Sequence, residues 1–153
     1  MKATKIRVTK VFTFDMAHAL FGYDGPCKNI HGHTYRLSVT LIGKQVQDEN
    51  NPKQAMVIDF KDFKQIVISN VIEVFDHTLV LKADTPYAKI QGLTNNFERI
   101  IYSEYQPSCE NLLLDMVNRI EGKLTENVEL HNVKLEETLT SYAEWFKGDN
   151  CFI

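Results

Sequence analysis

The stretch that decides the fold covers residues 12–41 and reads FTFDMAHALFGYDGPCKNIHGHTYRLSVTL. Two series of mostly apolar residues alternate along it, Phe12, Phe14, Met16 and His18, then His31, His33, Tyr35, Leu37, Val39 and Leu41. A period of two is typical of a β-strand with one buried face. The stretch therefore predicts two strands that pair as a hairpin through the connection at residues 22–26.

The three histidines in these series form a candidate metal site. The hairpin brings His18 towards His31 and His33, and Gly32 leaves room between the last two. Three neutral imidazoles suit Zn²⁺, and a fourth position that stays open for water or substrate is typical of catalytic zinc. A His-x-His pair alone is often only the polar edge of a strand, but a third histidine at this spacing favours metal binding.

Cys27 lies just ahead of the second histidine pair and has two possible roles. It could be a fourth metal ligand that closes the site, or a reactive thiolate beside an open zinc. We favour the second role, because a thiolate there can act as a base or nucleophile. Together with Cys109 and Cys151, Cys27 makes an odd number of cysteines without paired spacing. This predicts that the protein has no disulfide and is located in the reducing cytoplasm.

Composition narrows the class of protein. The chain has 153 residues, of which 44% are hydrophobic, enough for one core and a single domain over residues 1–153. We find no apolar run long enough for a membrane span or a signal peptide. The net charge of −3 argues against nucleic-acid binding as the main function.

The remaining pattern alternates between strands and helices. Residues 5–14, 33–43 and 99–105 read as strands, residues 79–81 as a short apolar run, and residues 128–139 alternate again. Asp59 caps a helix that ends near Phe75, and Pro107 with Ser108 opens a second helix that ends around Gly122. The order predicts an α+β fold, an antiparallel sheet with two helices on one face. Exposed sheet edges favour oligomerisation.

Two further places carry candidate chemistry. Asp76 and His77 put a carboxylate beside an imidazole, which can orient the ring for proton transfer, although such a pair at a helix end is commonly a surface turn. Glu137 shares a strand face with Val133, Leu135 and Leu139. A buried carboxylate there needs donors, which a ligand with paired N–H groups would supply; the alternative is a strand-end glutamate that reaches solvent.

Together these motifs resemble the 6-pyruvoyl-tetrahydropterin synthase and 6-carboxytetrahydropterin synthase superfamily. The matching stretches follow the family's order over nearly the whole chain: residues 14–18, 27–33, 57–60, 76–77, 107–111 and 137–138. The resemblance implies a tunnelling fold, in which subunits join their sheets into an oligomeric barrel, commonly a hexamer of two trimers, with active sites between subunits. It also favours a functional role for the Asp76–His77 pair over a surface turn, and for Glu137 over a glutamate that reaches solvent.

Residue by residue, the resemblance implies zinc ligands at His18, His31 and His33. It implies a catalytic cysteine at Cys27, a catalytic pair at Asp76 and His77, and a substrate-binding glutamate at Glu137 that anchors the pterin. The implied substrate is 7,8-dihydroneopterin triphosphate, a small molecule.

The spacing between Cys27 and His31 bears on the reaction. Three residues between them resemble the 6-carboxytetrahydropterin synthases of the queuosine and 7-deazaguanine pathway, which release acetaldehyde and triphosphate; pyruvoyl-forming members have a longer insertion. Two alternatives stay open, a 6-pyruvoyltetrahydropterin synthase and a non-catalytic zinc or pterin-binding module. The chain departs from compact bacterial members in a longer connection at residues 82–106 and in Ser108, where the family often has threonine.

Overall fold

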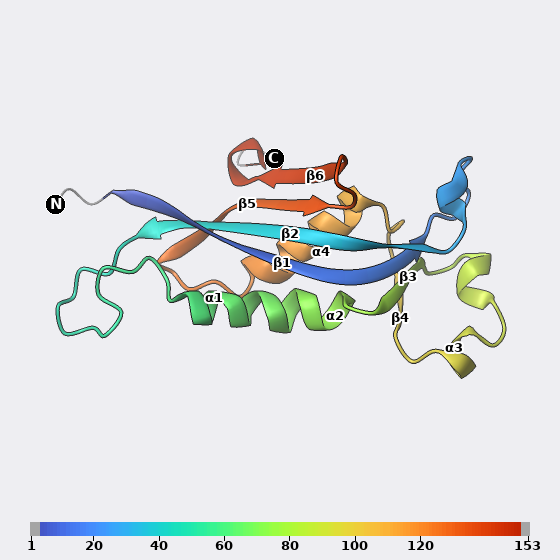
Figure 1. The fold of residues 1–153 in the computed structure, drawn as a ribbon, viewed down its shortest axis with the longest axis horizontal. Helices are drawn as coiled ribbons and strands as arrows, with labels where there is room; N and C mark the ends of the chain where they lie inside the picture. The colour runs from blue at the N-terminus through green and yellow to red at the C-terminus, as the bar shows by residue number, and fades with distance from the viewer. Residues whose placement is uncertain (1–3, 151–153) are drawn as a thin grey trace.

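A computed structural model describes residues 4–150, so Cys151 lies outside the described residues. Within the described residues, six strands form one sheet in the order β4-β3-β1-β2-β5-β6. The strands are β1 (Lys5–Ala19), β2 (His31–Lys44), β3 (Thr78–Lys82), β4 (Ile100–Ser103), β5 (Val128–Glu136) and β6 (Tyr142–Phe146). The long β1 and β2 form the centre of the sheet, and α1 and α4 run alongside it (Figure 1).

The predicted hairpin is confirmed. β1 and β2 pair antiparallel from Lys5 opposite Lys44 to His18 opposite His31, so both strands extend further than expected. The alternation also holds, because Phe14, Met16 and Tyr35 are buried on one face. His18 and His31 therefore close the paired part of the hairpin on the same face as the core.

The expectation of an antiparallel sheet is wrong for β3 and β4. β2, β5 and β6 pair antiparallel with their neighbours, but β3 runs parallel to β1, and β4 runs parallel to β3. The helix before β3 ends beside the last third of β1, where the His77 N–H donates to Asp15 O at 2.7 Å. The helix runs in the same direction as β1 (Figure 1), and only two residues separate it from β3, so the chain continues in that direction and joins the free edge of β1.

Both predicted helices pack on one face of the sheet. The first comprises α1 (Phe60–Val67), a π-helical turn η2 (Ile68–Ile72) and α2 (Glu73–Phe75), with Asp59 as N-cap. The second, α4 (Cys109–Glu121), is capped by Ser108 and ends at Gly122. Side chains from both helices join the strands in one core cluster, which includes Phe63, Val67, Met116, Leu37 and Leu135.

Short helical turns fill the two connections at one end of the sheet. They are η1 (Pro26–Lys28) between β1 and β2, and η3 (Pro86–Lys89) and α3 (Leu93–Asn96) between β3 and β4. A further turn, η4 (Lys147–Asn150), follows β6. Within residues 4–150, no helix is long and apolar enough to cross a membrane.

The end of β5 differs from its predicted pattern. The strand stops at Glu136, and Leu139, expected on the buried face, is fully exposed in the turn before β6. The Glu137 N–H donates to Ser141 O at 3.1 Å, so the backbone of Glu137 begins the turn. Residues Tyr142–Phe146, for which no strand is predicted, form the edge strand β6.

Candidate active site

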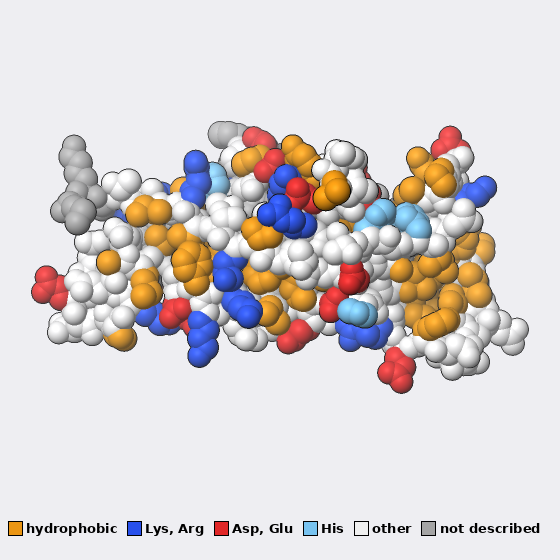
Figure 2. All heavy atoms as spheres, in the orientation of Figure 1, with side chains coloured by type: hydrophobic (Ala, Val, Ile, Leu, Met, Phe, Trp, Pro, Cys, Tyr) orange, Lys and Arg blue, Asp and Glu red, His pale blue; other side chains and the backbone are white. Residues whose placement is uncertain are grey.

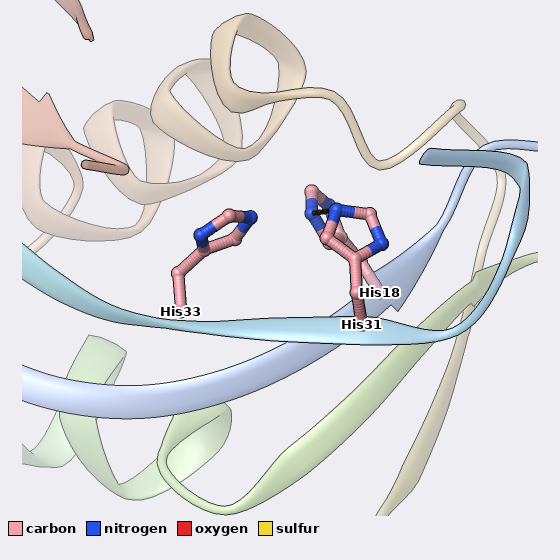
Figure 3. Close-up of side chains that lie close together, drawn as sticks. All are labelled: His18, His31 and His33. Atoms are coloured by element: carbon pink, nitrogen blue, oxygen red, sulfur yellow. Dashed lines mark hydrogen bonds between the residues drawn. The ribbon is translucent and has the colours of Figure 1, made fainter. Parts of the chain in front are cut away.

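The three histidines lie together, as the hairpin predicted. One ring nitrogen from each of His18, His31 and His33 falls within 4.8 Å of the others. His18 is 2% exposed, whereas His31 and His33 are half-buried. Figure 3 shows His31 and His33 rising from β2 on the same side as His18, towards the segment that leads into α4. We call these three residues the histidine cluster.

Backbone carbonyls fix which nitrogen carries hydrogen in two of the three rings, His18 and His31. His18 Nδ1 lies 2.7 Å from Pro107 O, and His31 Nδ1 lies 2.8 Å from Asn29 O. A carbonyl oxygen only accepts, so both Nδ1 atoms must donate. In the neutral rings, each Nε2 then holds a free lone pair, as a metal ligand requires.

The two free nitrogens face each other at close range. His18 Nε2 lies 3.1 Å from His31 Nε2 (dashed in Figure 3). Two lone pairs at this distance repel unless a proton or a cation lies between them. Burial lowers the pKa of His18, and the neighbouring histidines lower it further, although Pro107 and Glu137 oppose the shift. The cluster therefore fits a divalent metal ion held by nitrogen, with zinc among the ions that such ligands suit.

Glu137 borders the histidine cluster, even though it lies just beyond β5. Its Oε1 atom lies 3.5 Å from His18 Nε2 and 3.9 Å from His33 Nε2. The hydroxyl of Tyr35 donates to the same oxygen at 3.0 Å. Burial, followed by the charge of Glu137, raises the pKa of Tyr35 well above its usual range, so the hydroxyl keeps its proton and remains a donor.

The two described cysteines differ in their surroundings. Both are free and half-buried. Burial, followed by the charge of Glu137, raises the pKa of Cys109 to about 11, so this thiol stays protonated at neutral pH and is a poor base. Cys27 lies in η1, in the connection that leads from His18 at the end of β1 to His31 at the start of β2.

Asp76 and His77 form a contact of their own. His77 Nδ1 lies 3.0 Å from Asp76 Oδ1, which also accepts from the Asp15 N–H at 3.0 Å. The side chains are 39% and 72% exposed for Asp76 and His77. Partial burial raises the pKa of Asp76, but the bonds from Asp15 and His77 and the charge of Arg99 outweigh burial and hold it below its ordinary value.

The Asp76–His77 pair lies apart from the histidine cluster. In the described part of the chain, neither residue shares a hydrogen bond or ion pair with the cluster or with Glu137. His77 instead opens onto a cavity of about 900 Å³. Its lining includes Asp15, Ala17, Gly32 and Thr34, which alternate with the histidines and so lie on the opposite face of the hairpin; His33 also borders it.

The far wall of this cavity comes from the connection between β3 and β4. Leu93, Asn96, Phe97, Glu98 and Arg99 line it. Hydrophobic side chains gather over this end of the molecule (Figure 2), and Ile30, Ile90 and Phe97 are among the exposed ones. The cavity is therefore largely apolar, with His77 from the helix end and Glu98 and Arg99 from the connection among its ionisable groups.

Sequence reasoning missed several groups that support these sites. Tyr35 alternates with His33 on the buried face, so its contact with Glu137 had a signal in the pattern. The carbonyl groups of Pro107 and Asn29 left no signal in the sequence, because every residue has a backbone carbonyl. Arg99 was also missed, because it lies far from Asp76 in the sequence and only the tertiary structure brings the two together.

Comparisons with known proteins agree on one family. The family model described as 6-pyruvoyl tetrahydropterin synthase matches residues 7–147. A Haemophilus influenzae protein named 6-carboxy-5,6,7,8-tetrahydropterin synthase is 33% identical over 141 residues, which cover 91% of this chain and 97% of that protein. A protein of the same name from Rickettsia bellii is 33% identical over 143 residues, covering 91% and 99%.

A solved structure has the same fold. The 6-pyruvoyl tetrahydropterin synthase of Caenorhabditis elegans superposes with a TM-score of 0.68 at 23% identity. The match covers 95% of this chain and 98% of that one. At this identity the likeness concerns the fold, and the sequence relatives carry the family assignment.

Proposed function

The chain belongs to the 6-pyruvoyl tetrahydropterin synthase family, and from this premise we propose that it is a zinc-dependent 6-carboxy-5,6,7,8-tetrahydropterin synthase. The substrate is 7,8-dihydroneopterin triphosphate, and the products are the 6-carboxy pterin, acetaldehyde and triphosphate, in queuosine and 7-deazaguanine biosynthesis. The observation that carries the proposal is the 3.5 Å distance between Glu137 Oε1 and His18 Nε2, because a carboxylate beside the candidate metal ligands can accept N–H groups from a pterin ring.

The residues have distinct tasks in this proposal. His18, His31 and His33 hold Zn²⁺, which when bound supplies Lewis-acid polarisation of the substrate's side-chain oxygens. Glu137, steadied by the Tyr35 hydroxyl, accepts N–H groups from the pyrimidinone edge and fixes the ring. Cys27 as thiolate and His77, oriented by Asp76, move protons at the side-chain carbons of the substrate.

The assembly belongs to the same proposal. We propose that copies of this single domain join their sheets into a barrel, as a hexamer of two trimers. β4 and β6 are the edge strands of the described sheet and offer backbone groups for such pairing. The separation of the Asp76–His77 pair from the histidine cluster also supports an active site shared between copies. The free thiols of Cys27 and Cys109 fit a cytoplasmic location.

Turnover by zinc-loaded protein tests the reaction. The protein is incubated with 7,8-dihydroneopterin triphosphate, the pterin is identified by mass spectrometry, and acetaldehyde is assayed separately. A 6-carboxy pterin with stoichiometric acetaldehyde is expected. A pterin that keeps its three-carbon side chain would assign the chain to the 6-pyruvoyl branch, and zinc binding without turnover would favour a binding module.

A further inference from the structure

The 82–106 connection contacts the loop that carries Cys27. We call residues 20–30 the Cys27 loop. The Tyr87 hydroxyl donates to Lys28 O at 2.6 Å, and its ring meets Phe21 edge-on with centroids 5.3 Å apart. Gln106 bonds the Phe21 backbone twice, donating from Nε2 at 2.8 Å and accepting at Oε1 at 3.2 Å. Both ends of the connection therefore hold this loop.

The same connection also contacts the helix end that carries Asp76 and His77. His77 has a φ of 56°, the left-handed region that a side chain rarely adopts, so its neighbours must hold this turn. Arg99 donates from Nη2 to Glu73 O at 2.7 Å and from Nε to Asp76 O at 3.0 Å. A planar guanidinium can bond both carbonyls at once, and its charge is favourable at a helix C-terminus.

The backbone of Arg99 holds the other side of the turn. Its carbonyl accepts from the Leu79 N–H at 2.9 Å, at the start of the pairing between β3 and β4. The Arg99 side chain therefore bonds the backbone just before His77, and the Arg99 carbonyl bonds the backbone just after it. The turn cannot shift without breaking bonds on both sides.

We infer that the 82–106 connection is a brace that sets the position of the Cys27 loop through Tyr87 and of the Asp76–His77 turn through Arg99. The inference rests on the proposed function, since Cys27 and His77 are the proposed proton-transfer groups. Tyr87 and Arg99 are positioning residues, because they act on the substrate only through these groups. The three candidate zinc ligands lie on β1 and β2, and neither Tyr87 nor Arg99 bonds any of them, so we expect variants at both positions to keep their zinc.

Two variants separate the two halves of the brace. Arg99→Ala removes the bonds to the helix end, and Tyr87→Phe removes the bond to Lys28 while it keeps the ring on Phe21. We expect kcat to fall about 10- to 100-fold in Arg99→Ala with KM within about twofold, because misplaced groups slow the chemical step. Guanidinium ion added to Arg99→Ala should restore part of kcat. The comparison of kcat requires that wild type and both variants contain the same amount of zinc.

Two measurements test the brace without turnover. The alkylation rate of Cys27 by iodoacetamide, followed on its own peptide by mass spectrometry, should rise at least about threefold in Tyr87→Phe, as the half-buried thiol becomes more accessible. The rate should stay at the wild-type value in Arg99→Ala. A crystal structure of Arg99→Ala should show the Asp76–His77 turn displaced, with the contact between its two side chains lost.

Arg119→Ala is the matched control. Its guanidinium lies 5.3 Å from the Phe75 ring at the same helix end, but it bonds Asp115 at 2.9 Å. Arg119→Ala should keep kcat; a loss equal to that of Arg99→Ala would overturn the inference. So would an unmoved turn in Arg99→Ala, or unchanged Cys27 alkylation in Tyr87→Phe. A wild-type protein without turnover would instead defeat the proposed function, while alkylation and the crystal structure still decide the brace.

Discussion

The histidine cluster and the Asp76–His77 pair are built in opposite ways. His18 is 2% exposed and is fixed by the carbonyl of Pro107, just before α4. The Asp76 and His77 side chains are 39% and 72% exposed, and they face a wide cavity. The histidine cluster thus joins one fully buried ring to two half-buried ones, whereas the Asp76–His77 pair is held firmly at its backbone and left open at its side chains.

The difference follows from the supporting elements. The cluster stands on two long paired strands, where the register places His18 opposite His31. The pair stands at a helix end, where the chain leaves the helix through a left-handed residue. Strand pairing fixes side chains by repetition, but a helix end needs contacts from other segments. We therefore expect substitutions in the two regions to affect different measurements.

The largest expected effect is on metal binding by the histidine cluster. His18→Ala removes the most buried candidate ligand, and we expect zinc affinity to fall by at least about 1,000-fold, since loss of an outer hydrogen-bond partner alone costs 10- to 100-fold. Zinc content is measured by elemental analysis after dialysis. His131→Ala, which changes a histidine outside the cluster, should retain full zinc. Full zinc in His18→Ala would remove this residue from the ligand set.

Asp76→Asn tests the other side of the comparison. The amide keeps the size of the side chain but cannot stabilise a charged His77, so we expect kcat to fall about 100-fold with zinc content unchanged. Steady-state kinetics and elemental analysis are run on the same samples. The control Asp84→Asn changes an exposed aspartate in a turn and should behave as wild type. Zinc loss in Asp76→Asn would show that the two regions are not independent.

Tyr35→Phe sharpens the comparison within the buried site. It removes the donor to Glu137 Oε1, and we expect KM to rise about 10-fold, or about 1.4 kcal/mol, with zinc content unchanged. Tyr105→Phe is the matched control, since its hydroxyl also donates to a carboxylate, Asp115 at 2.7 Å, outside the proposed site. An equal rise in KM for both variants would indicate general loosening.

The smallest expected effect concerns acid stability. The pKa of Asp76 lies below its ordinary value of 3.8, so its bonds stabilise the folded state above that pH and are lost as the pH falls through the lowered pKa. The side chain is 39% exposed, so solvent screening keeps this contribution well below about 1 kcal/mol. Urea unfolding of wild type and Asp76→Asn should differ at pH 6, and the difference should shrink as the pH falls below 3.8. A difference that grows towards pH 3 would contradict the sign.

Local sequence patterns determined much of the fold and most of the candidate site. Alternation set the hairpin and put three histidines on one face, because side-chain direction in a strand follows residue number. The caps Asp59 and Ser108 fixed where both helices begin, since they bond nearby backbone N–H groups. These features depend on residues close in sequence.

Only the tertiary structure decided the rest. The direction of β3 and β4, the exposed Leu139 and the inward turn of Glu137 depend on where distant segments meet. The same holds for the face to which the Asp76–His77 pair opens, and for the 82–106 connection that supports it. Contacts between residues far apart in sequence leave no periodic pattern in it. The residue types therefore predicted the chemistry, and packing determined how the groups are arranged.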